Sequence, residues 1–530
     1  LLSLKSGIIN FYSNQPDRIF KYNPSFDIHL SNPEDDRLVG RFKTESFEAL
    51  GKKIKTQIKQ ALEIQYKERI EFFKDNNWQS NFSNYENDLH DRFVENRTRL
   101  FIGRKNLLHI LDEHVEGTSR NILGVYGEPG AGKSALLAQF YKQLLANDDI
   151  LLIPHFVGAN PASTSHYQML LRFCRILKDV FNITDDIPFE LNKLIDTFHV
   201  FLNMATKKVV IIIDGLNQLE SNFAAHSLGW LPNDFNQNVK IIASTLNGKT
   251  KEALLGKTAL RLDVLPLTKA EQHDIIRGLP SVFAKTLDAQ FVNMISKKID
   301  SNGKYPAENP LYIKLLIEEL RVFGSFEKLE ELIQKFPAST NNMFGFLLKR
   351  LEDEHGTAIV ERLFCLLECS RYGLTMKEII DLLQSADSSK QFQLIHRQIR
   401  DYLHNRGELI DFFHQSFSKA VRVKYFNNQE CGISGAGINY HRLLAEYFSH
   451  LSSISRKIDE LPYQLFKSQQ WEKLSVLLAT PDFFKSLWEK SRIDVLHYWK
   501  VIHENSDIKI TEAFSRVLEN PENLRNSCMP

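Results

Sequence analysis

The chain has 530 residues, of which 43% are hydrophobic and 25% are charged. This length exceeds what one hydrophobic core supports, so we expect roughly three to five domains. Lysine and arginine total 66 against 65 for aspartate and glutamate, which excludes the basic field of a general nucleic-acid binder and the acidic excess of a disordered chain.

Cysteine use indicates a cytoplasmic protein, and hydropathy indicates a soluble one. The 5 cysteines contain no C-x-x-C pair, which predicts reduced thiols. Cys365 and Cys369 share a helix face, and we interpret them as core residues because nothing nearby completes a metal site. The most concentrated apolar run, Val209–Ile213, is much shorter than the roughly 20 residues of a membrane-spanning helix. We therefore expect neither a membrane span nor a nucleic-acid partner.

Residues 1–98 are interpreted as the end of an upstream domain followed by a helical connector. Leu1 is not an initiating methionine and no signal peptide follows it, which indicates the interior of a longer protein. Scattered prolines among polar residues predict irregular structure up to about residue 40.

The connector is expected to contain two helices. Apolar residues recur at helical spacing from Phe47 and predict an amphipathic helix that runs to about Phe73. A polar break at Asp75–Asn87 follows, and a shorter helix then ends near Thr98.

Residues 99–265 have a different character, because short β-branched runs alternate with longer helical segments. This alternation predicts a parallel sheet covered by helices and joined by right-handed crossovers. The helical segments are Ala135–Leu145, Tyr167–Phe181 and Leu191–Ala205. The predicted strands are Asn121–Tyr126, Ile150–Val157, Val209–Ile213, Val239–Ser244 and Leu260–Leu265.

A phosphate-binding motif lies between the first predicted strand and the first helix. The segment Gly-Glu-Pro-Gly-Ala-Gly-Lys-Ser matches G-x-x-x-x-G-K-[ST] in the required strand–loop–helix context. Backbone N–H groups of such a turn converge on phosphate oxygens, and the helix N-terminus adds partial positive charge. Lys133 is predicted to act as a catalytic point charge and Ser134 as a Mg²⁺ ligand. The predicted nucleotide-binding residues of this loop are Gly127, Glu128, Pro129, Gly130, Ala131, Gly132, Lys133 and Ser134.

A second motif supports this interpretation independently. The apolar strand Val209–Ile213 ends in Asp214, the Walker B arrangement, which predicts Asp214 as a catalytic residue that holds Mg²⁺. A carboxylate in this position is often only a helix cap, but the upstream phosphate loop favours the metal role. The strand Ile150–Val157, between the two motifs in sequence, favours the ASCE-type ATPase branch over nucleotide kinases.

After Pro266 the predicted strands stop. Thr268 and Glu271 form a capping box that opens a helical lid over residues 266–338. Residues 339–430 are interpreted as a winged-helix-like domain, since a helix near Leu374–Ile380 and a short strand near Leu409–Phe413 lie among helices. Residues 431–530 are helical and are expected to begin a repeat array of tetratricopeptide (TPR) type.

The motifs in their order resemble a known class of proteins. The chain is similar to STAND-class, NACHT-like P-loop ATPases, and most similar to the nephrocystin and telomerase-associated-protein group with tetratricopeptide-type repeats. The segments that carry the resemblance are Phe101–Arg104, Gly127–Ser134, Ile213–Leu219, Trp230–Pro232 with Val239–Thr245, and Asn309–Tyr312.

The resemblance implies further nucleotide-binding residues. Ile102, Gly103 and Arg104 are implied to lie near the adenine, and Pro310 of the lid to close the base pocket. A proline there is alternatively a simple helix N1 residue. His414 is implied to touch the β-phosphate of bound ADP, and the alternative for this residue is a satisfied core histidine.

The chain also departs from the class where hydrolysis is concerned. Asn217 and Gln218 follow Asp214 where acidic residues are usual, and amides cannot act as a general base. Glu220 is the nearest carboxylate. After the strand Val239–Ser244, Thr245-Leu246-Asn247 replaces the arginine that often senses the γ-phosphate, so we expect slow or absent hydrolysis.

Taken together, these features predict a signal-transduction switch that binds ATP or ADP with Mg²⁺ and changes its domain arrangement with nucleotide state. Protein partners are expected through an upstream domain and the C-terminal repeats, and homo-oligomers in the ATP state are implied by the resemblance alone. Two other functions stay open: an interaction scaffold with a structural nucleotide, and a P-loop transferase acting on a small substrate.

Overall fold

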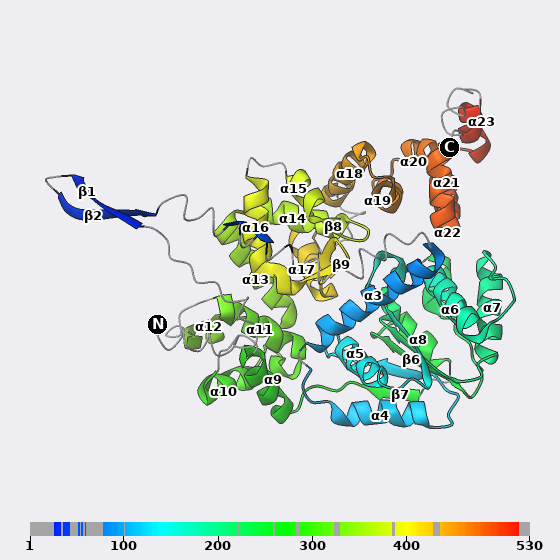
Figure 1. Cartoon of the computed structure of the whole chain (residues 1–530), viewed down its shortest axis with the longest axis horizontal. Coiled ribbons are helices and arrows are strands. Elements are labelled where there is room, and N and C mark those ends of the chain that lie inside the picture. The colour runs from blue at the N-terminus through cyan, green and yellow to red at the C-terminus, as the bar shows by residue number, and fades with distance from the viewer. Residues whose placement is uncertain are drawn as a thin grey trace. The chain divides into compact units, whose positions relative to one another are not determined.

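Figure 1 shows the computed structural model of the chain, which falls into two compact units, Leu1–Asn84 and Tyr85–Pro530. The residues that the structure describes are 26–32, 35–42, 51–52, 55–56, 59, 78–99, 101–220, 222–257, 260–281, 287–322, 329–383, 387–427 and 435–518.

The first unit contains a β-hairpin where irregular structure was expected. Strands β1 (Phe26–Asn32) and β2 (Asp35–Phe42) pair in antiparallel register, with Phe26 opposite Phe42. The expectation for residues 1–40 was therefore wrong at these positions, because it gave weight to the prolines and overlooked the alternation of apolar and polar residues from Phe26 to Leu30. The helix predicted from Phe47 lies largely outside the described residues.

Helix α3 (Trp78–Thr98) begins earlier than predicted, inside the segment that was expected to be a polar break. Asparagine and aspartate lower helix propensity, but tertiary packing overrides a weak local preference. Leu89, Phe93 and Val94 lie on one face of the helix and are buried, and before them Glu86 and Asn87 contact Arg172 of the sheet domain, so tertiary contacts reach into the expected break.

The nucleotide-fold region contains a five-stranded parallel sheet in the order β4-β5-β6-β3-β7. Every predicted strand is present, within two residues of its expected start and end. Strand β6 separates β3, which leads into the phosphate loop, from β5, which ends in Asp214, and this order confirms the ASCE-type fold. The strands are β3 (Leu123–Tyr126), β4 (Ile150–Phe156), β5 (Lys208–Asp214), β6 (Val239–Thr245) and β7 (Leu260–Asp263).

Helices cover both faces of this sheet. Successive side chains of β5 point to opposite faces, so Val209 and Ile211 pack in one apolar cluster and Val210 and Ile212 in another. Helices α3, α4 (Lys105–Glu116) and α5 (Lys133–Leu144) cover the face of Val210. Helices α6 (His166–Phe181), α7 (Leu191–Asn203) and α8 (Lys249–Leu255) cover the other face.

The lid begins at the predicted capping box. The Thr268 N–H donates to Glu271 Oε2 at 2.9 Å, and the Glu271 N–H donates back to Thr268 Oγ1 at 3.3 Å. The lid helices are α9 (Lys269–Ser281), α10 (Ala289–Lys297), α11 (Pro310–Val322) and α12 (Leu329–Lys335).

The winged-helix prediction is confirmed by a small antiparallel sheet among helices, in the order β8-β10-β9. Its strands are β8 (Leu374–Thr375), β9 (Leu403–Arg406) and β10 (Leu409–Phe412). Its helices are α13 (Thr340–His355), α14 (Thr357–Cys369), α15 (Met376–Leu383), α16 (Ser388–Ile399) and α17 (Gln415–Tyr425).

The C-terminal region is helical, as predicted. One apolar cluster of buried residues runs from Leu267 to Ala513, so the lid, the winged helix and the C-terminal helices share a core. The C-terminal helices are α18 (Gly435–His450), α19 (Ile454–Lys467), α20 (Trp471–Ala479), α21 (Pro481–Lys490), α22 (Arg492–Asn505) and α23 (Ile510–Leu518). Short 3₁₀ segments lie at Pro161–Thr164, Leu216–Gln218, Asn222–Ser227, Pro306–Glu308 and Arg400–Tyr402.

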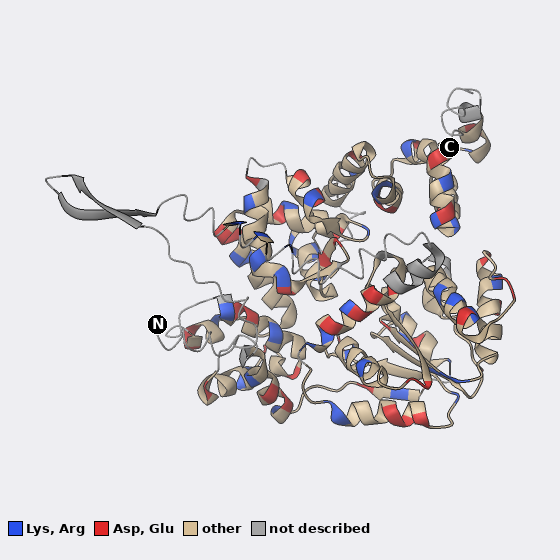
Figure 2. Ribbon diagram, in the orientation of Figure 1, with Lys and Arg blue, Asp and Glu red and all other residues tan. Residues whose placement is uncertain are grey.

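The cysteines and the charged residues can be located in the part of the chain that is described. Cys365 and Cys369 are buried and not disulfide-bonded, and no cluster of potential metal ligands was found among the described residues. Acidic and basic residues are interspersed along the described helices (Figure 2). None of those helices combines the length and apolarity needed to cross a bilayer.

Candidate functional site

A cleft of about 1030 Å³ lies at the carboxyl ends of β3 and β5. Parallel sheets place ligands at this edge, because the loops after the strands converge there. Side chains from the phosphate loop, α3, the lid, the winged helix and the C-terminal helices all line the cleft. Ile102, Arg104, Pro129–Ser134, Asp214, Pro310 and His414 are the predicted site residues among them, whereas Gly103, Gly127 and Glu128 do not line it.

The phosphate loop has the backbone that its glycines permit. Gly130 and Gly132 take left-handed φ angles of 80° and 95°. Lys133 is buried, and its Nζ donates to the carbonyl oxygens of Gly127 at 2.7 Å and Glu128 at 3.1 Å. Burial lowers the pKa of Lys133 to about 8, although Asp214 and Glu128 act in the opposite direction. The loop therefore places a positive charge at the N-terminus of α5.

Asp214 is buried at the end of β5 and is fixed by its neighbour on β6. Its Oδ1 accepts a hydrogen bond from Ser244 Oγ at 2.5 Å, and the same hydroxyl accepts from the Gly215 N–H at 2.8 Å. Asp214 and Ser134 line one cleft with Lys133. A carboxylate and a hydroxyl beside a glycine cradle are ligands suited to Mg²⁺ and phosphate, so these residues fit a Mg²⁺-nucleotide.

The lid contacts the phosphate loop directly. Asn309 Nδ2 donates to the carbonyl oxygen of Pro129 at 2.9 Å, and Asn309 Oδ1 accepts from the Leu311 N–H at 2.9 Å. Pro310 is the first residue of α11 and also lines the cleft, so the two roles considered for it are compatible. Its Cγ would lie 3.9 Å from a Cβ built on Gly132.

Replacing Gly130 with alanine is expected to separate the lid from the loop. A Cβ at Gly130 would lie 2.7 Å from Asn309 Oδ1 and 2.8 Å from Leu311 Cβ, at a positive φ that alanine avoids. We expect Gly130→Ala to lower the free energy of unfolding by about 2–3 kcal/mol, measured by urea denaturation. The matched control is Gly345→Ala in α13, where nothing lies within 4 Å of the added Cβ. That change is expected to stabilise the chain by up to about 1 kcal/mol, and equal effects of the two changes would contradict the clash.

The turn before α4, at Gly103 and Arg104, contacts the start of the lid. Gly103 and Arg104 take φ angles of 78° and 58°, and Arg104 Nη2 donates to the Leu265 carbonyl oxygen at 2.7 Å. Arg104 Nε lies 3.8 Å from Glu271 Oε1, the capping-box carboxylate of α9. Ile102 and Arg104 line the cleft, and their contact with an adenine stays a prediction.

His414 is brought to the phosphate loop by the winged helix. Its Nδ1 accepts from the Ser416 N–H at 3.1 Å as the N-cap of α17, and its ring lines the cleft. Burial, with further effects of Arg97, Lys133 and Lys314, lowers the pKa of His414 to about 3, so the ring is neutral at physiological pH. The winged helix thus folds back onto the cleft, the condition under which His414 is able to contact a phosphate.

The residues after β5 are engaged in contacts that sequence patterns do not reveal. Asn217 Oδ1 accepts from the Leu246 N–H at 3.1 Å, which links the loops after β5 and β6. Asn247 Nδ2 donates to Glu128 Oε1 at 3.0 Å. Glu220, the carboxylate nearest to the motif in sequence, lines the cleft and contacts Arg371 of the winged-helix region.

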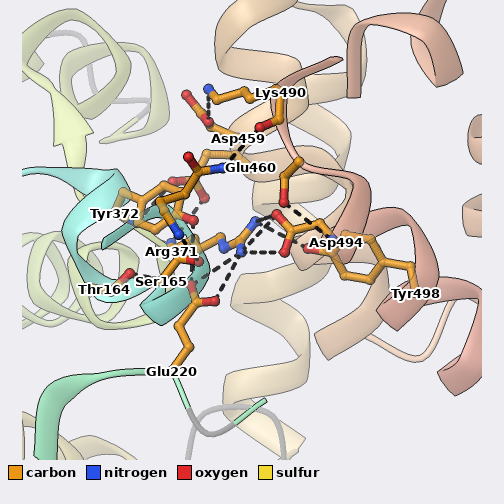
Figure 3. Close-up of polar contacts among 12 residues, drawn as sticks. Thr164, Ser165, Glu220, Arg371, Tyr372, Asp459, Glu460, Lys490, Asp494 and Tyr498 are labelled. Carbon is orange, nitrogen blue, oxygen red and sulfur yellow. Dashed lines mark hydrogen bonds and ion pairs between the residues drawn. The ribbon is translucent and has the colours of Figure 1, made fainter. Parts of the chain in front are cut away.

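Arg371 is the centre of a polar network that joins three parts of the second unit (Figure 3). Its Nη2 lies 3.2 Å from Glu220 Oε1 of the sheet domain and 3.2 Å from Asp494 Oδ2 of α22. The Glu460 carboxylate of α19 accepts from the backbone N–H groups of Arg371 and Tyr372, at 3.1 and 3.2 Å. Burial acts to lower the pKa of Arg371, but Asp494 and neighbouring groups outweigh it and raise the pKa well above its ordinary value.

Several cleft residues were not identified from the sequence. Arg97 and Lys314, which line the cleft, were not singled out at all, and Asn309, which contacts the phosphate loop at Pro129, was recognised only as part of a motif. A signal was present for each cation: Arg97 follows Leu89 and Phe93 on the buried face of α3, and Lys314 interrupts the apolar run of α11.

Comparisons with known proteins agree with this architecture. Residues 115–253 match the family described as AAA domain, and residues 327–399 match the NWD1-like, winged helix-turn-helix domain. A TPR repeat-containing protein of Dictyostelium discoideum is 26% identical over 496 residues, which cover 79% of this chain and 29% of that protein. NACHT domain- and WD repeat-containing protein 1 of Homo sapiens is 23% identical over 443 residues, which cover 71% of this chain and 28% of that protein. Telomerase protein component 1 of Mus musculus is 26% identical over 279 residues, covering 49% and 10%.

These matches confirm the resemblance to STAND-class, NACHT-like P-loop ATPases that the motifs indicated. The chain has a P-loop nucleotide fold whose residues 115–253 match the AAA domain model, followed by a winged helix and a helical region. It spans less than a third of the length of each of these three relatives, at 29%, 28% and 10%.

Proposed function

We propose that this chain is an ATP- and ADP-binding signal-transduction switch of the STAND/NACHT type, in which nucleotide state controls domain arrangement and partner assembly. The observation that carries the proposal is that one cleft is lined by the phosphate loop, the lid, the winged helix and the C-terminal helices. A ligand in such a cleft has access to every part whose position a switch must control.

The cleft offers a division of roles for a bound Mg²⁺-nucleotide. Gly127–Ser134 would hold the phosphates, with Lys133 as the positive charge, and Ser134 and Asp214 would hold Mg²⁺. The metal would neutralise charge on the phosphates. Ile102, Arg104 and Pro310, which line the cleft, would surround the base, with Gly103 in the turn that carries Ile102 and Arg104, and His414 would contact a phosphate as a neutral group.

Each moving part touches the site through a small number of polar or charged contacts. Asn309 connects the lid to Pro129, Arg97 contacts Phe413 of the winged helix, and Arg371 connects Glu220 to Asp494 of the C-terminal helices. A change of charge in the cleft alters the stability of such contacts, and ligands that stabilise two arrangements unequally shift their populations. Through these contacts, nucleotide binding would change the arrangement of the lid, the winged helix and the C-terminal helices.

A second candidate function is a non-hydrolysing scaffold with a structural nucleotide. It is favoured by one specific observation: Asn217 and Glu220, where a catalytic base would be sought, are both engaged in contacts with other residues. Slow hydrolysis would require Glu220 to leave Arg371.

Identification of the copurified nucleotide, together with phosphate release, separates the switch from the scaffold. The switch predicts bound ADP or ATP and slow turnover that Asp214→Ala abolishes, while Asp149→Ala at an exposed position leaves turnover unchanged. Bound nucleotide without turnover would support the scaffold. A chain that copurifies with no nucleotide and binds none would overturn both.

Partners are proposed from the relatives and the helical C-terminal region. A TPR repeat-containing protein and a WD repeat-containing protein are among the relatives, and repeats of this kind present protein-binding surfaces. We propose that the chain is cytoplasmic. We also propose that helices α18–α23 are the first helices of a repeat array. Homo-oligomers are expected with a triphosphate, and light scattering that gives one mass with ADP and with a non-hydrolysable ATP analogue would contradict this.

A further inference from the structure

Arg97 extends from α3 into the cleft, although it belongs to none of the recognised motifs. Its Nη2 donates to the Phe413 carbonyl oxygen at 3.1 Å. Its guanidinium carbon lies 3.8 Å from the centre of the Phe413 ring and 4.8 Å from that of Phe93. The segment that precedes the sheet therefore delivers a positive charge to the nucleotide cleft.

Lys314 brings a second positive charge from the lid. It lies on α11, one turn after Pro310, between buried apolar neighbours on both sides. Its Nζ lies 4.1 Å from the centre of the same Phe413 ring. Two cations from elements outside the sheet thus contact one aromatic ring, at the end of β10 in the winged helix.

Lysine and arginine outnumber aspartate and glutamate among the residues that line the cleft, by eight to six. Arg97, Lys133 and Lys314 line it together, and each of these cations disfavours the protonation of His414. The charge of Asp214 raises the pKa of both Arg97 and Lys133, while Glu318 and Asp401 raise the pKa of Lys314, although burial lowers all three. Cations that are partly buried and repel one another favour an anion between them, since desolvated charge requires a partner.

We propose that Arg97 and Lys314 form a second anion subsite in the cleft, which takes the terminal phosphate of a nucleoside triphosphate and competes with Phe413 for both cations. The inference rests on the proposed function, because it assumes that the rest of the nucleotide binds at Gly127–Ser134. The subsite supplies the charge that is absent after β6, where Thr245-Leu246-Asn247 stand. It also distinguishes ATP from ADP, because a third phosphate that binds Arg97 and Lys314 weakens their contacts with Phe413 of the winged helix.

The test measures the affinities of the full chain, freed of nucleotide, for ADP and for a non-hydrolysable ATP analogue by isothermal titration calorimetry with Mg²⁺. Arg97→Gln and Lys314→Gln are each expected to reduce affinity for the triphosphate about tenfold or more, because each removes one charged contact to phosphate. Affinity for ADP is expected to change by less than about threefold.

Matched controls separate the subsite from a general effect on folding. Arg92→Gln removes an exposed arginine from the same helix, and Lys390→Gln removes an exposed lysine from α16. Both are expected to leave the two affinities unchanged. Thermal denaturation without ligand shows whether each variant is folded. Because Arg97 and Lys314 lie on different helices, each variant is a separate test of the subsite.

Phe413→Leu provides a readout that a purely structural role of the cations would not give. This change keeps Arg97 and Lys314 but removes their competing ring, so it is expected to raise affinity for the triphosphate about twofold or more. A loss of affinity in Phe413→Leu, or equal losses for ADP and triphosphate in the charge variants, would overturn the subsite and leave the nucleotide switch intact. Failure of the unsubstituted chain to bind either nucleotide would overturn the switch itself.

Discussion

Arg371→Met is expected to lower the free energy of unfolding by about 3–5 kcal/mol, the largest effect on stability that we predict for a single change. Arg371 is buried, and its guanidinium lies between the carboxylates of Glu220 and Asp494. Without it, two partly buried carboxylates would face each other with no cation between them. Urea denaturation followed by circular dichroism gives the free energy of unfolding.

The comparison variants show whether the effect comes from the network. Arg397→Met removes an exposed arginine from α16 and is expected to change the free energy of unfolding by less than about 0.5 kcal/mol. Adding Glu220→Gln and Asp494→Asn to Arg371→Met removes the unpaired charges and is expected to restore about half of the loss. If Arg371→Met matched Arg397→Met, the network would not hold the three parts together.

Lys133→Ala is expected to reduce affinity for ADP and ATP about 100-fold or more, the largest effect on binding. The ammonium of Lys133 is held inside the phosphate loop by the carbonyl oxygens of Gly127 and Glu128, where it would meet the phosphates of a nucleotide. Loss of a desolvated charge contact of this kind is worth about 3 kcal/mol, which corresponds to that factor. Calorimetric titration with either nucleotide measures it.

Lys133→Ala should weaken nucleotide binding much more than it lowers the stability of the fold. The ligand-free chain loses two hydrogen bonds to backbone carbonyls and the attraction of Asp214 and Glu128, but burial disfavours the charged ammonium, so Lys133→Ala is expected to lower the free energy of unfolding by only about 1 kcal/mol. Lys142→Ala, at an exposed position on the same helix α5, is the control and should affect neither quantity. Full nucleotide affinity in Lys133→Ala would show that the phosphate site lies elsewhere.

Local patterns were sufficient for the sheet and its phosphate loop. The run Val209–Ile213 is apolar on both faces because helices cover both sides of β5, and such a run is recognisable without any knowledge of its partners. The loop Gly127–Ser134 and the capping box at Thr268 are equally local. The strands, the loop and the lid start were therefore predictable from the chain alone.

Features that depend on distant partners were not predictable. Arg371 contacts Glu220 across 151 positions of sequence, and Arg97 contacts Phe413 across 316. Neither arginine lies in a motif, and only the fold brings the partners together. The expected break at Asp75–Asn87 is a similar case, because Glu86 and Asn87 at its end contact Arg172, a residue 85 positions from Asn87 in the sequence.

The missing sensor arginine illustrates the limit of reasoning by motif. Thr245-Leu246-Asn247 stand in its place after β6, and slow or absent hydrolysis was the expectation drawn from that replacement. The structure places Arg97 and Lys314 in the same cleft from α3 and α11. A positive charge near a phosphate can come from any element that reaches the cleft, so a gap in one motif does not establish that the charge is absent.

The central claim, that nucleotide state controls domain arrangement, is tested most directly by a distance between two spin labels on the full chain. Gln143→Cys on α5 and Lys473→Cys on α20 place labels at exposed positions of the sheet domain and the C-terminal helices. Cys431 and Cys528 are replaced by serine, and the buried Cys174, Cys365 and Cys369 are retained. We expect one distance distribution with ADP and a longer, broader one with a non-hydrolysable ATP analogue, whereas identical distributions with both nucleotides would contradict the switch.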